Sequence, residues 1–148
     1  MLGRRDVRNP NVVPESDLKS WDNQGLVSCL GEVTDVRPMM AKSDVVVLPS
    51  CREGIPRALL EAAAMAKPII TTDAVGCREV VDDEINGLLV PVKDAPALAG
   101  AMERMINDPE MRKRMGKAGR KKVEREFDEK IVIKKILKTY DIGAECLL

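Results

Sequence analysis

Two carboxylates flank a turn that contains glycine and proline near the middle of the chain. Glu53 and Glu61 have seven residues between them, and Gly54 and Pro56 follow the first carboxylate closely. Pro56 suits the first position of a helix, because its missing N–H would have no partner there and its φ is already helical. The free N–H groups of a first helical turn attract phosphate, and Gly54 lets the backbone approach a ligand. The stretch therefore predicts an anion-binding helix start beside two carboxylates that can only accept hydrogen bonds.

Glu61 also has an ordinary interpretation. It lies in an otherwise apolar segment, and Arg57 precedes it by four residues on the same helical face. Such a pair would be a surface ion pair that contributes roughly 0.3–0.5 kcal/mol to stability. The helix alone does not decide between a binding role and this ion pair.

Short apolar strands and helices must position these residues. Asp44-Val-Val-Val-Leu48 is rich in β-branched residues and is expected to be a fully buried parallel strand. A loop that leaves the carboxyl end of such a strand is where open α/β sheets bind ligands. A second strand-end loop, 73–76, carries Gly76, and a helical turn is expected over 77–82. The predicted strands are 26–30, 44–48, 67–72 and 87–91, and their alternation with helices predicts a Rossmann-like parallel sheet with flanking helices.

Helices are expected on both sides of this region. A short helix over 14–21 should end at Gly25, and Asp35 can cap a small helix that runs to 41. From Asp94 onward the pattern predicts helices only, with the basic run 112–125 on a solvated face. Asp128 can cap the last helix. The residues expected to face the core are Leu98, Ala101, Met102, Met105, Ile106, Met111, Met115, Gly119, Val123, Phe127, Ile133, Ile136, Leu137 and Tyr140.

Composition excludes several functional classes. The chain has 148 residues, enough for one domain with a core, and its 24 Lys and Arg balance 24 Asp and Glu, so nucleic acid is not an expected partner. Histidine is absent and aromatic residues make up 2%, which removes histidine-based catalysis and metal sites and base-stacking platforms. The four cysteines, Cys29, Cys51, Cys77 and Cys146, lack Cys-x-x-Cys spacing, so buried free thiols are expected rather than disulfides or a zinc site. No metal site is predicted.

Four separated landmarks resemble the retaining GT-B glycosyltransferases of the GT4 type (group 1). The stretch 49–62 is similar to the Glu-x7-Glu motif of that family, and 66–81 and 86–91 are similar to its next two landmarks, in the expected order and at the expected distances. The opening of the chain, with Trp21 and Leu30-Gly31, resembles the bacterial polysaccharide-biosynthesis branch. The match covers about residues 20 to 140.

The resemblance implies that residues 1–148 form a single donor-binding domain, the C-terminal half of a GT-B fold, with 94–148 as its helical extension. It implies that Glu53 contacts the donor sugar as the catalytic carboxylate, and that Glu61 binds the ribose hydroxyls. Backbone groups near the helix start would meet the sugar and diphosphate, and the loop at Gly31 would frame the base. The implied donor-binding residues are Gly31, Glu32, Val33, Glu53, Gly54, Ile55, Pro56, Arg57 and Glu61.

The implied activity is retaining transfer of a hexosyl group from a nucleotide-sugar, expected to be UDP-linked, to a saccharide or lipid-linked acceptor, without a cofactor. The family's N-terminal acceptor domain and first donor-domain strand have no counterpart here, so we expect a truncated chain that is inactive alone and can pair as a homodimer. A cytoplasmic location is implied, with the full-length enzyme peripheral to the inner face of the membrane. The alternatives are a nucleotide-sugar-binding module without activity and a GT-B nucleotide-sugar epimerase relative.

Overall fold

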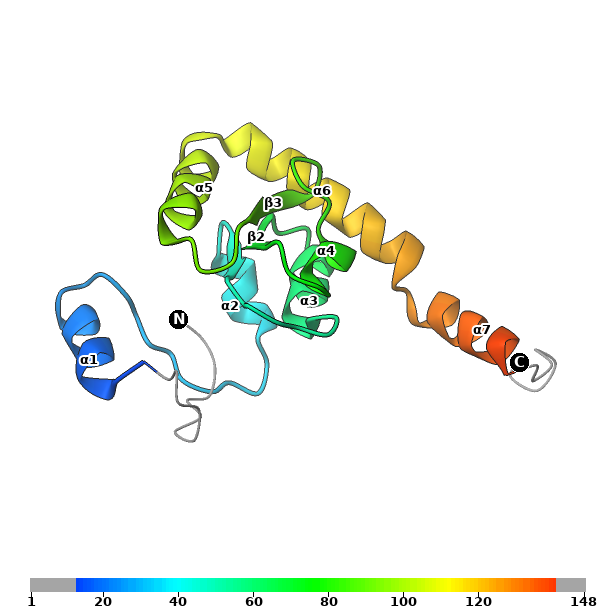
Figure 1. Ribbon diagram of the computed structural model, residues 1–148, viewed down its shortest axis with the longest axis horizontal. Helices are drawn as coiled ribbons and strands as arrows, with labels where there is room; N and C mark the ends of the chain where they lie inside the picture. The colour runs from blue at the N-terminus through cyan, green and yellow to red at the C-terminus, as the bar shows by residue number, and fades with distance from the viewer. Residues whose placement is uncertain (1–12, 141–148) are drawn as a thin grey trace. The chain divides into compact units, whose positions relative to one another are not determined.

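The computed structural model describes residues 13–140, and the chain divides into two compact units, Met1–Pro38 and Met39–Leu148 (Figure 1). The first unit contains helix α1 (Glu15–Asn23), in which Lys19 Nζ lies 2.8 Å from Glu15 Oε1. Gly25 follows the helix with a φ of +68°. This confirms the predicted helix and its glycine stop.

The predicted strand over 26–30 is wrong, because these residues are irregular. The N–H of Leu26 donates to the carbonyl of Trp21 at 3.0 Å and so belongs to the turn that ends α1. Leu26 is 69% exposed and Leu30 is 52% exposed. A short apolar run becomes a strand only where a neighbouring strand and a core cover it, and the sheet of the second unit does not include these residues.

Helix α2 (Arg37–Lys42) follows Asp35, whose Oδ1 accepts a hydrogen bond from the N–H of Arg37 at 3.0 Å, which confirms the predicted cap. Lys67 then fixes the end of α2. Its Nζ donates to the carbonyls of Ala41 at 2.7 Å and Ser43 at 2.9 Å, so the helix is tied to the segment that leads into the central strand.

The sheet of the second unit has three parallel strands, β1 (Val46–Leu48), β2 (Ile69–Thr72) and β3 (Gly87–Val90), in that order. The central strand β2 is entirely buried. Strand β1 is shorter than predicted and only half-buried, which corrects the expectation of a fully buried strand over 44–48. The physical reason is its place at the edge of the sheet, where one side has no neighbouring strand in the described structure.

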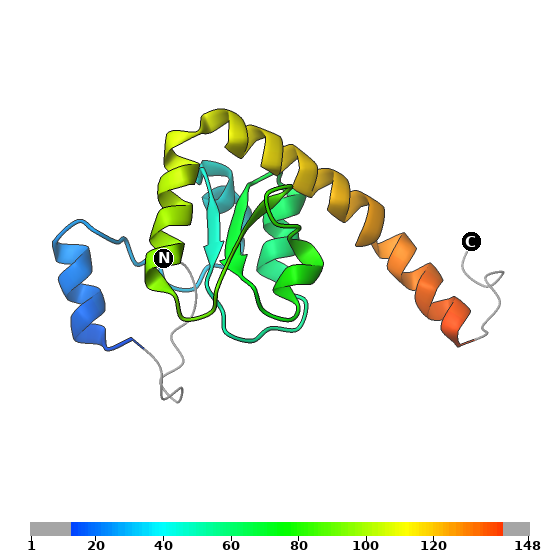
Figure 2. The ribbon, with the colours of Figure 1, turned by 45° about the horizontal axis from the view of Figure 1, so that its top comes forward.

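Two apolar clusters cover the two faces of the sheet, because successive residues of β2 point to opposite sides. Ile69 packs in one cluster with α3 (Arg57–Ala64) and α4 (Cys77–Val80). Ile70 packs in the other with α5 (Ala95–Asn107). Figure 2 shows this arrangement, with α3 and α4 on one side of the strands and α5 on the other.

Helix α6 (Pro109–Glu126) takes part in both clusters. Met111 and Met115 pack beside α5, whereas Val123 packs beside α3. A Cβ at Gly116 would overlap the carbonyl oxygen of Ala66, so glycine is required for the close approach of α6 to the end of α3. The Met stripe predicted for this helix is confirmed.

The remaining helical predictions hold in part. In α5, Ala101 and Met105 are buried, but Met102 is 41% and Ile106 68% exposed. Lys122 is the buried exception within the basic run of α6, since its Nζ pairs with Asp82 Oδ1 at 2.7 Å.

Helix α7 (Glu129–Thr139) begins at the predicted cap, Asp128, whose Oδ1 accepts from the N–H of Lys130 at 2.9 Å. It contains no buried residue, so the prediction that its apolar side chains face the core is wrong. The reason is that α7 contacts α6 beyond the edge of the sheet, where no second layer covers it in the described structure. No helix within residues 13–140 is both long and apolar enough to span a membrane.

Candidate functional site

The candidate site is the loop 49–56, which joins the carboxyl end of β1 to α3. Pro56 is buried and has an extended backbone, with φ of −71° and ψ of 117°, so it caps α3 and the helix begins at Arg57. The predicted start is thus one residue early. Leu59 N–H donates to the Pro56 carbonyl at 3.0 Å, whereas the N–H groups of Arg57 and Ala58 have no hydrogen-bond partner among residues 13–140. These two free donors point out of the helix start, as an anion site requires.

The loop 73–76 after β2 contacts this first loop. Gly76 has a φ of +84°, and a Cβ at this position would overlap the carbonyl oxygen of Gly54 and lie 2.8 Å from the carbonyl oxygen of Glu53. Only glycine fits both the backbone conformation and the contact. The loop 73–76 therefore packs directly against the backbone of Glu53 and Gly54 and restricts its movement.

Two threonine hydroxyls of β2 fix the start of the same loop. Thr71 Oγ1 donates to the Leu48 carbonyl at 2.8 Å, and Thr72 Oγ1 donates to the Ser50 carbonyl. Both threonines are buried. The first residues after β1 are thus bonded to the central strand, which limits how far the loop can move.

The two carboxylates lie on this loop–helix unit in different surroundings. Glu53 is half-buried, and its carboxylate makes no ion pair with a described residue. Glu61 Oε1 lies 3.4 Å from Arg57 Nη2, with side chains 38% and 90% exposed. The ordinary ion pair considered from the sequence is therefore present, but it is long and solvated, so its contribution to stability is about 0.5 kcal/mol or less. A ligand could replace Arg57 as the partner of Glu61 at little cost.

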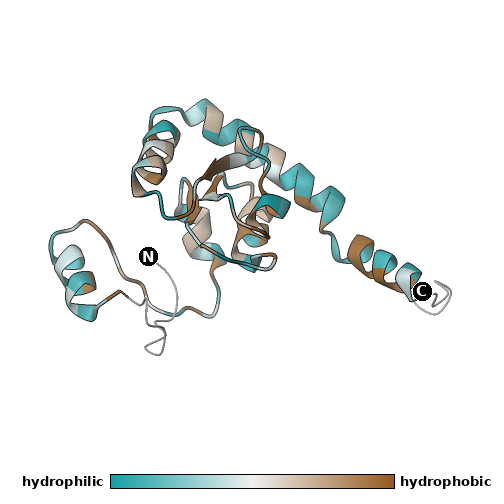
Figure 3. Cartoon of the chain, in the orientation of Figure 1, coloured by the Kyte–Doolittle hydropathy of each residue, from teal (hydrophilic) through white to brown (hydrophobic). Residues whose placement is uncertain are grey.

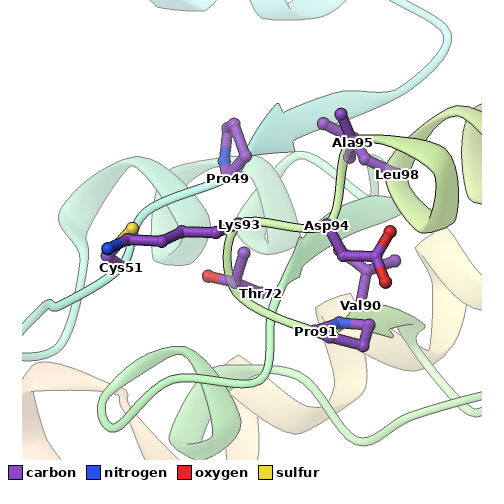
Figure 4. Close-up of a pocket in the computed structure, with 9 residues that line it drawn as sticks. All are labelled: Pro49, Cys51, Thr72, Val90, Pro91, Lys93, Asp94, Ala95 and Leu98. Carbon is purple, nitrogen blue, oxygen red and sulfur yellow. The ribbon is translucent and has the colours of Figure 1, made fainter.

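Two cavities border the unit. One of about 240 Å³ lies at the carboxyl ends of all three strands (Figure 4). Its lining residues are Pro49, Cys51, Thr72, Val90, Pro91, Lys93, Asp94, Ala95 and Leu98. The other, of about 320 Å³, lies between α3 and α6 and is lined in part by Glu61, Arg120 and Phe127. Glu53 lines neither of them, so the described residues alone do not enclose both carboxylates in one cavity.

The predicted donor-binding residues divide between the two units. Glu53, Gly54, Ile55, Pro56, Arg57 and Glu61 are brought together on one loop and helix of the second unit. Gly31, Glu32 and Val33 lie in the first unit, where Gly31 has a φ of +68°. Their role in framing a base stays a prediction.

Sequence reasoning missed the structural partners of the loop. Thr71 and Thr72 were expected only as strand residues, although two hydroxyls at a strand end could have indicated bonds to a neighbouring loop. Lys93 was not singled out either. It has a φ of +60°, and its side chain extends along the first cavity toward Cys51 (Figure 4). No sequence signal marks that conformation, because lysine rarely adopts it.

The described part of the chain contains no group of three or more His, Cys, Asp or Glu side chains that could hold a metal ion. Cys29, Cys51 and Cys77 are free thiols, as predicted, but only Cys77 is buried. The expectation of burial is wrong for Cys29 and Cys51, which lie in exposed loops. Cys146 lies outside the described residues. The chemistry offered by the site is thus that of backbone N–H donors and carboxylate acceptors.

Comparison with known proteins agrees with this geometry. The family model described as glycosyl transferases group 1 matches residues 16–122. The chain is 32% identical over 141 residues to the N,N'-diacetylbacillosaminyl-diphospho-undecaprenol alpha-1,3-N-acetylgalactosaminyltransferase of Campylobacter jejuni, covering 95% of this chain and 36% of that protein. It is 31% identical over 135 residues to the capsular polysaccharide biosynthesis glycosyltransferase CapM of Staphylococcus aureus, with 91% and 36% covered.

Solved structures show the same fold. The crystal structure of Anabaena HepE in complex with UDP superposes with a TM-score of 0.84 at 24% identity, over 95% of this chain and 39% of that one. In its complex with UDP-glucose the same protein matches with a TM-score of 0.77 at 25% identity, again over 95% and 39%. The α/β architecture predicted from the sequence, the C-terminal half of a GT-B fold, is confirmed. Because the family model matches well over half of the residues, this chain belongs to the group 1 glycosyltransferases.

Proposed function

We propose that this chain is the donor-binding part of a retaining glycosyltransferase that uses a UDP-sugar. The chain spans 36% of the length of each of the two curated relatives described above, so the activity of the whole protein is part of the proposal. The observation that carries the proposal is the loop 49–56, which ends in two free N–H donors and is held by the second strand-end loop. A preorganised anion cradle of this kind suits a diphosphate.

Each group of the loop–helix unit has a proposed task. The N–H groups of Arg57 and Ala58 and the backbone around Gly54 would bind the diphosphate. Glu61 would accept hydrogen bonds from the ribose hydroxyls after releasing Arg57, and Glu53 would accept them from the donor sugar. The half-buried and unpaired state of Glu53 supports a ligand as its partner, since a partly desolvated carboxylate gains most from a charged hydrogen bond.

The choice of donor rests on the relatives. The HepE structure at 25% identity is a complex with UDP-glucose, and the Campylobacter relative is named as an N-acetylgalactosaminyltransferase. Both names support a UDP-linked hexose or N-acetylhexosamine as the donor of this chain. The same relative acts on a diphospho-undecaprenol-linked sugar, which supports a lipid-linked saccharide as the acceptor.

The proposed reaction needs no histidine. The bond between the anomeric carbon and the diphosphate oxygen breaks, the acceptor oxygen bonds to the same face of that carbon, and the acceptor proton passes to an oxygen of the leaving diphosphate. This chain would contribute by orienting the donor and by stabilising the charge that develops on the diphosphate. Glu53 would be the catalytic carboxylate that fixes the sugar for front-face attack.

Calorimetry with UDP, GDP and ADP, free and as sugar conjugates, tests the donor site. We expect weak binding of the UDP compounds. Glu61→Gln should weaken the binding of UDP and UDP-sugar alike, by roughly 1.5–3 kcal/mol for lost charged hydrogen bonds. Glu53→Gln should weaken only the sugar conjugate. Glu103→Gln, at an exposed residue of α5, is the matched control and should change neither.

Two results would count against this assignment of residues. One is the absence of heat with every nucleotide at millimolar concentration from a folded sample. The other is an equal effect of Glu53→Gln and Glu61→Gln on free UDP.

Transfer itself requires the acceptor to be oriented as well. Incubation of the 148-residue chain with labelled UDP-sugar and a lipid-linked acceptor should therefore give no product unless an acceptor domain is supplied.

A further inference from the structure

Thr72 is a buried hydroxyl residue at the carboxyl end of the central strand. It is 2% exposed, and its Oγ1 donates to the carbonyl of Ser50. Apart from Thr71 and Thr72, the strands of the sheet consist mainly of apolar residues, which are brown in Figure 3. A buried hydroxyl in such surroundings needs a hydrogen-bond partner. Thr72 has its partner in the loop that leads to Glu53 rather than in the sheet.

The loop 49–56 is anchored at its two ends by different groups. Its far end is held by the apolar core, because Pro56 is buried and Leu59, in the first turn of α3, is completely buried. Its near end is held by the hydrogen bond from Thr72 to the carbonyl of Ser50. The first anchor thus depends on apolar packing, and the second depends on one hydroxyl group.

The position of Glu53 depends on the near anchor. Glu53 follows Ser50 by three residues, and no residue from 49 to 55 is buried. Gly76 packs against the carbonyl of Glu53, but within residues 13–140 no hydrogen bond joins the loops 49–56 and 73–76. A packing contact without a bond prevents movement toward the neighbouring loop and leaves movement away from it free. The Thr72 hydroxyl limits that second movement.

We propose that Thr72 is a positioning residue for the donor sugar. Its hydroxyl holds the chain at Ser50 and thereby fixes the Glu53 carboxylate in the orientation that accepts hydrogen bonds from the sugar hydroxyls. A preorganised acceptor binds more tightly, because less conformational freedom is lost when the ligand arrives. This role rests on the proposed function of Glu53.

The proposed nucleotide contacts lie on α3 and do not share this anchor. The free N–H groups belong to Arg57 and Ala58, and Glu61 lies about one turn further along the helix. Leu59 holds this part of α3 in the apolar cluster. Loss of the Thr72 hydroxyl should therefore weaken the sugar contact and leave the nucleotide contacts in place.

Thr72→Val replaces the hydroxyl with a methyl group at nearly the same volume. We measure its binding by calorimetry with free UDP, UDP-glucose and UDP-N-acetylgalactosamine. Affinity for the sugar conjugate that the wild type binds should fall by roughly tenfold, the effect of losing one charged hydrogen bond. Affinity for free UDP should stay as in the wild type. Thr72→Ser retains the hydroxyl and should bind the sugar conjugate as the wild type does.

Thr71→Val is the matched comparison, because it removes an equally buried hydroxyl from the same strand. The partner of Thr71 is the carbonyl of Leu48, which lies within β1 and is already paired with β2. Thr71→Val should therefore reduce the affinity for the sugar conjugate much less than Thr72→Val does. Circular dichroism confirms that each variant is folded.

A double-mutant cycle with Glu53→Ala distinguishes positioning from a general structural effect. If Thr72 acts through Glu53, Thr72→Val should cause little further loss of UDP-sugar affinity once the carboxylate is absent. A structural effect of Thr72 that does not involve Glu53 would instead multiply with the effect of Glu53→Ala.

Nitrogen-15 relaxation tests the anchor without any ligand. In Thr72→Val the order parameter of the Glu53 N–H should fall from near the rigid value of about 0.85 toward the flexible value of about 0.6. The order parameter of Leu59, in the buried first turn of α3, should not change.

Three results would overturn the proposal. Folded Thr72→Val binds the sugar conjugate as tightly as the wild type, or it loses affinity for free UDP to the same extent, or its effect multiplies with that of Glu53→Ala. If the wild type binds no UDP-sugar, the proposed function fails and the relaxation measurement decides about Thr72. An unchanged order parameter of Glu53 would then overturn the positioning role as well, whereas a lower one would support it.

Discussion

The buried side chain of Asn86 allows a quantitative test of how the loop between α4 and β3 is held. Its Oδ1 accepts a hydrogen bond from the N–H of Asp82 at 2.6 Å, and its Nδ2 donates to the carbonyl of Val80 at 2.9 Å. The side chain is 1% exposed. Both bonds close the loop that returns the chain from α4 to the sheet.

The substitution Asn86→Ala removes both bonds and leaves their partners in place. An unsatisfied buried polar group costs about 1–3 kcal/mol. Val80 is completely buried, so its carbonyl should carry a cost near the upper part of that range. Asp82 is half-exposed, so water can replace part of its lost bond. We therefore expect the free energy of unfolding to fall by about 2–4 kcal/mol, a large part of the stability of a domain of this size.

Urea unfolding of the 148-residue chain, followed by far-ultraviolet circular dichroism, measures this difference. Asn107→Ala is the control, since Asn107 is exposed at the end of α5, and it should change stability by less than about 0.5 kcal/mol. The slope of the unfolding free energy against urea should be the same for all three proteins. A loss of less than about 1 kcal/mol for Asn86→Ala would refute the reasoning, because the Val80 carbonyl and the Asp82 N–H would then have found other hydrogen bonds or water.

Substitutions at three further positions test other features. Gly76→Ala should lower the free energy of unfolding by more than about 2 kcal/mol in urea unfolding, because the methyl group clashes with the neighbouring loop and the positive φ alone costs roughly 1–2 kcal/mol. Gly100→Ala is its counterpart in an open position of α5 and should raise stability by about 0.5–1 kcal/mol in the same assay. Lys122→Ala should lower the free energy of unfolding by about 1 kcal/mol or more beyond the effect of Lys122→Met, as measured by thermal unfolding, because Met keeps the buried apolar part of the lysine side chain. The half-exposed Asp82 can be hydrated after either substitution, so the loss of the ion pair is common to both.

Secondary structure was predicted best where the local sequence pattern favours the same element that the tertiary packing requires. The run at Ile69–Thr72 is β-branched throughout and lies in the centre of the sheet, and it forms most of the strand predicted over 67–72. The caps predicted at Asp35 and Asp128 likewise form, as hydrogen bonds from Arg37 N–H and Lys130 N–H, since a capping carboxylate needs only its own helix.

Prediction failed where an element depends on a distant neighbour. The residues 26–30 have a strand-like composition but no place in the three-stranded sheet. The side chains predicted to face the core in the last helix have the spacing of a core stripe, but spacing alone does not tell whether another layer will cover them; they are Ile133, Ile136, Leu137 and Tyr140. The contact between Gly54 and Gly76 could not be predicted from the sequence for the same reason. These residues are twenty-two positions apart in the chain, and the parallel sheet is what brings their loops together.

Helix α6 packs against the apolar clusters on both faces of the sheet, and this affects how the second unit unfolds. Met115 and Val123 lie in different apolar clusters, so release of this helix would expose both faces of β2 at once. Neither cluster can then unfold as an independent foldon. In native-state hydrogen exchange, the amides of Ile69, Ile70 and Thr71 should therefore form one slowest-exchanging group that opens only by global unfolding, with no separate rate for the two sides of the strand.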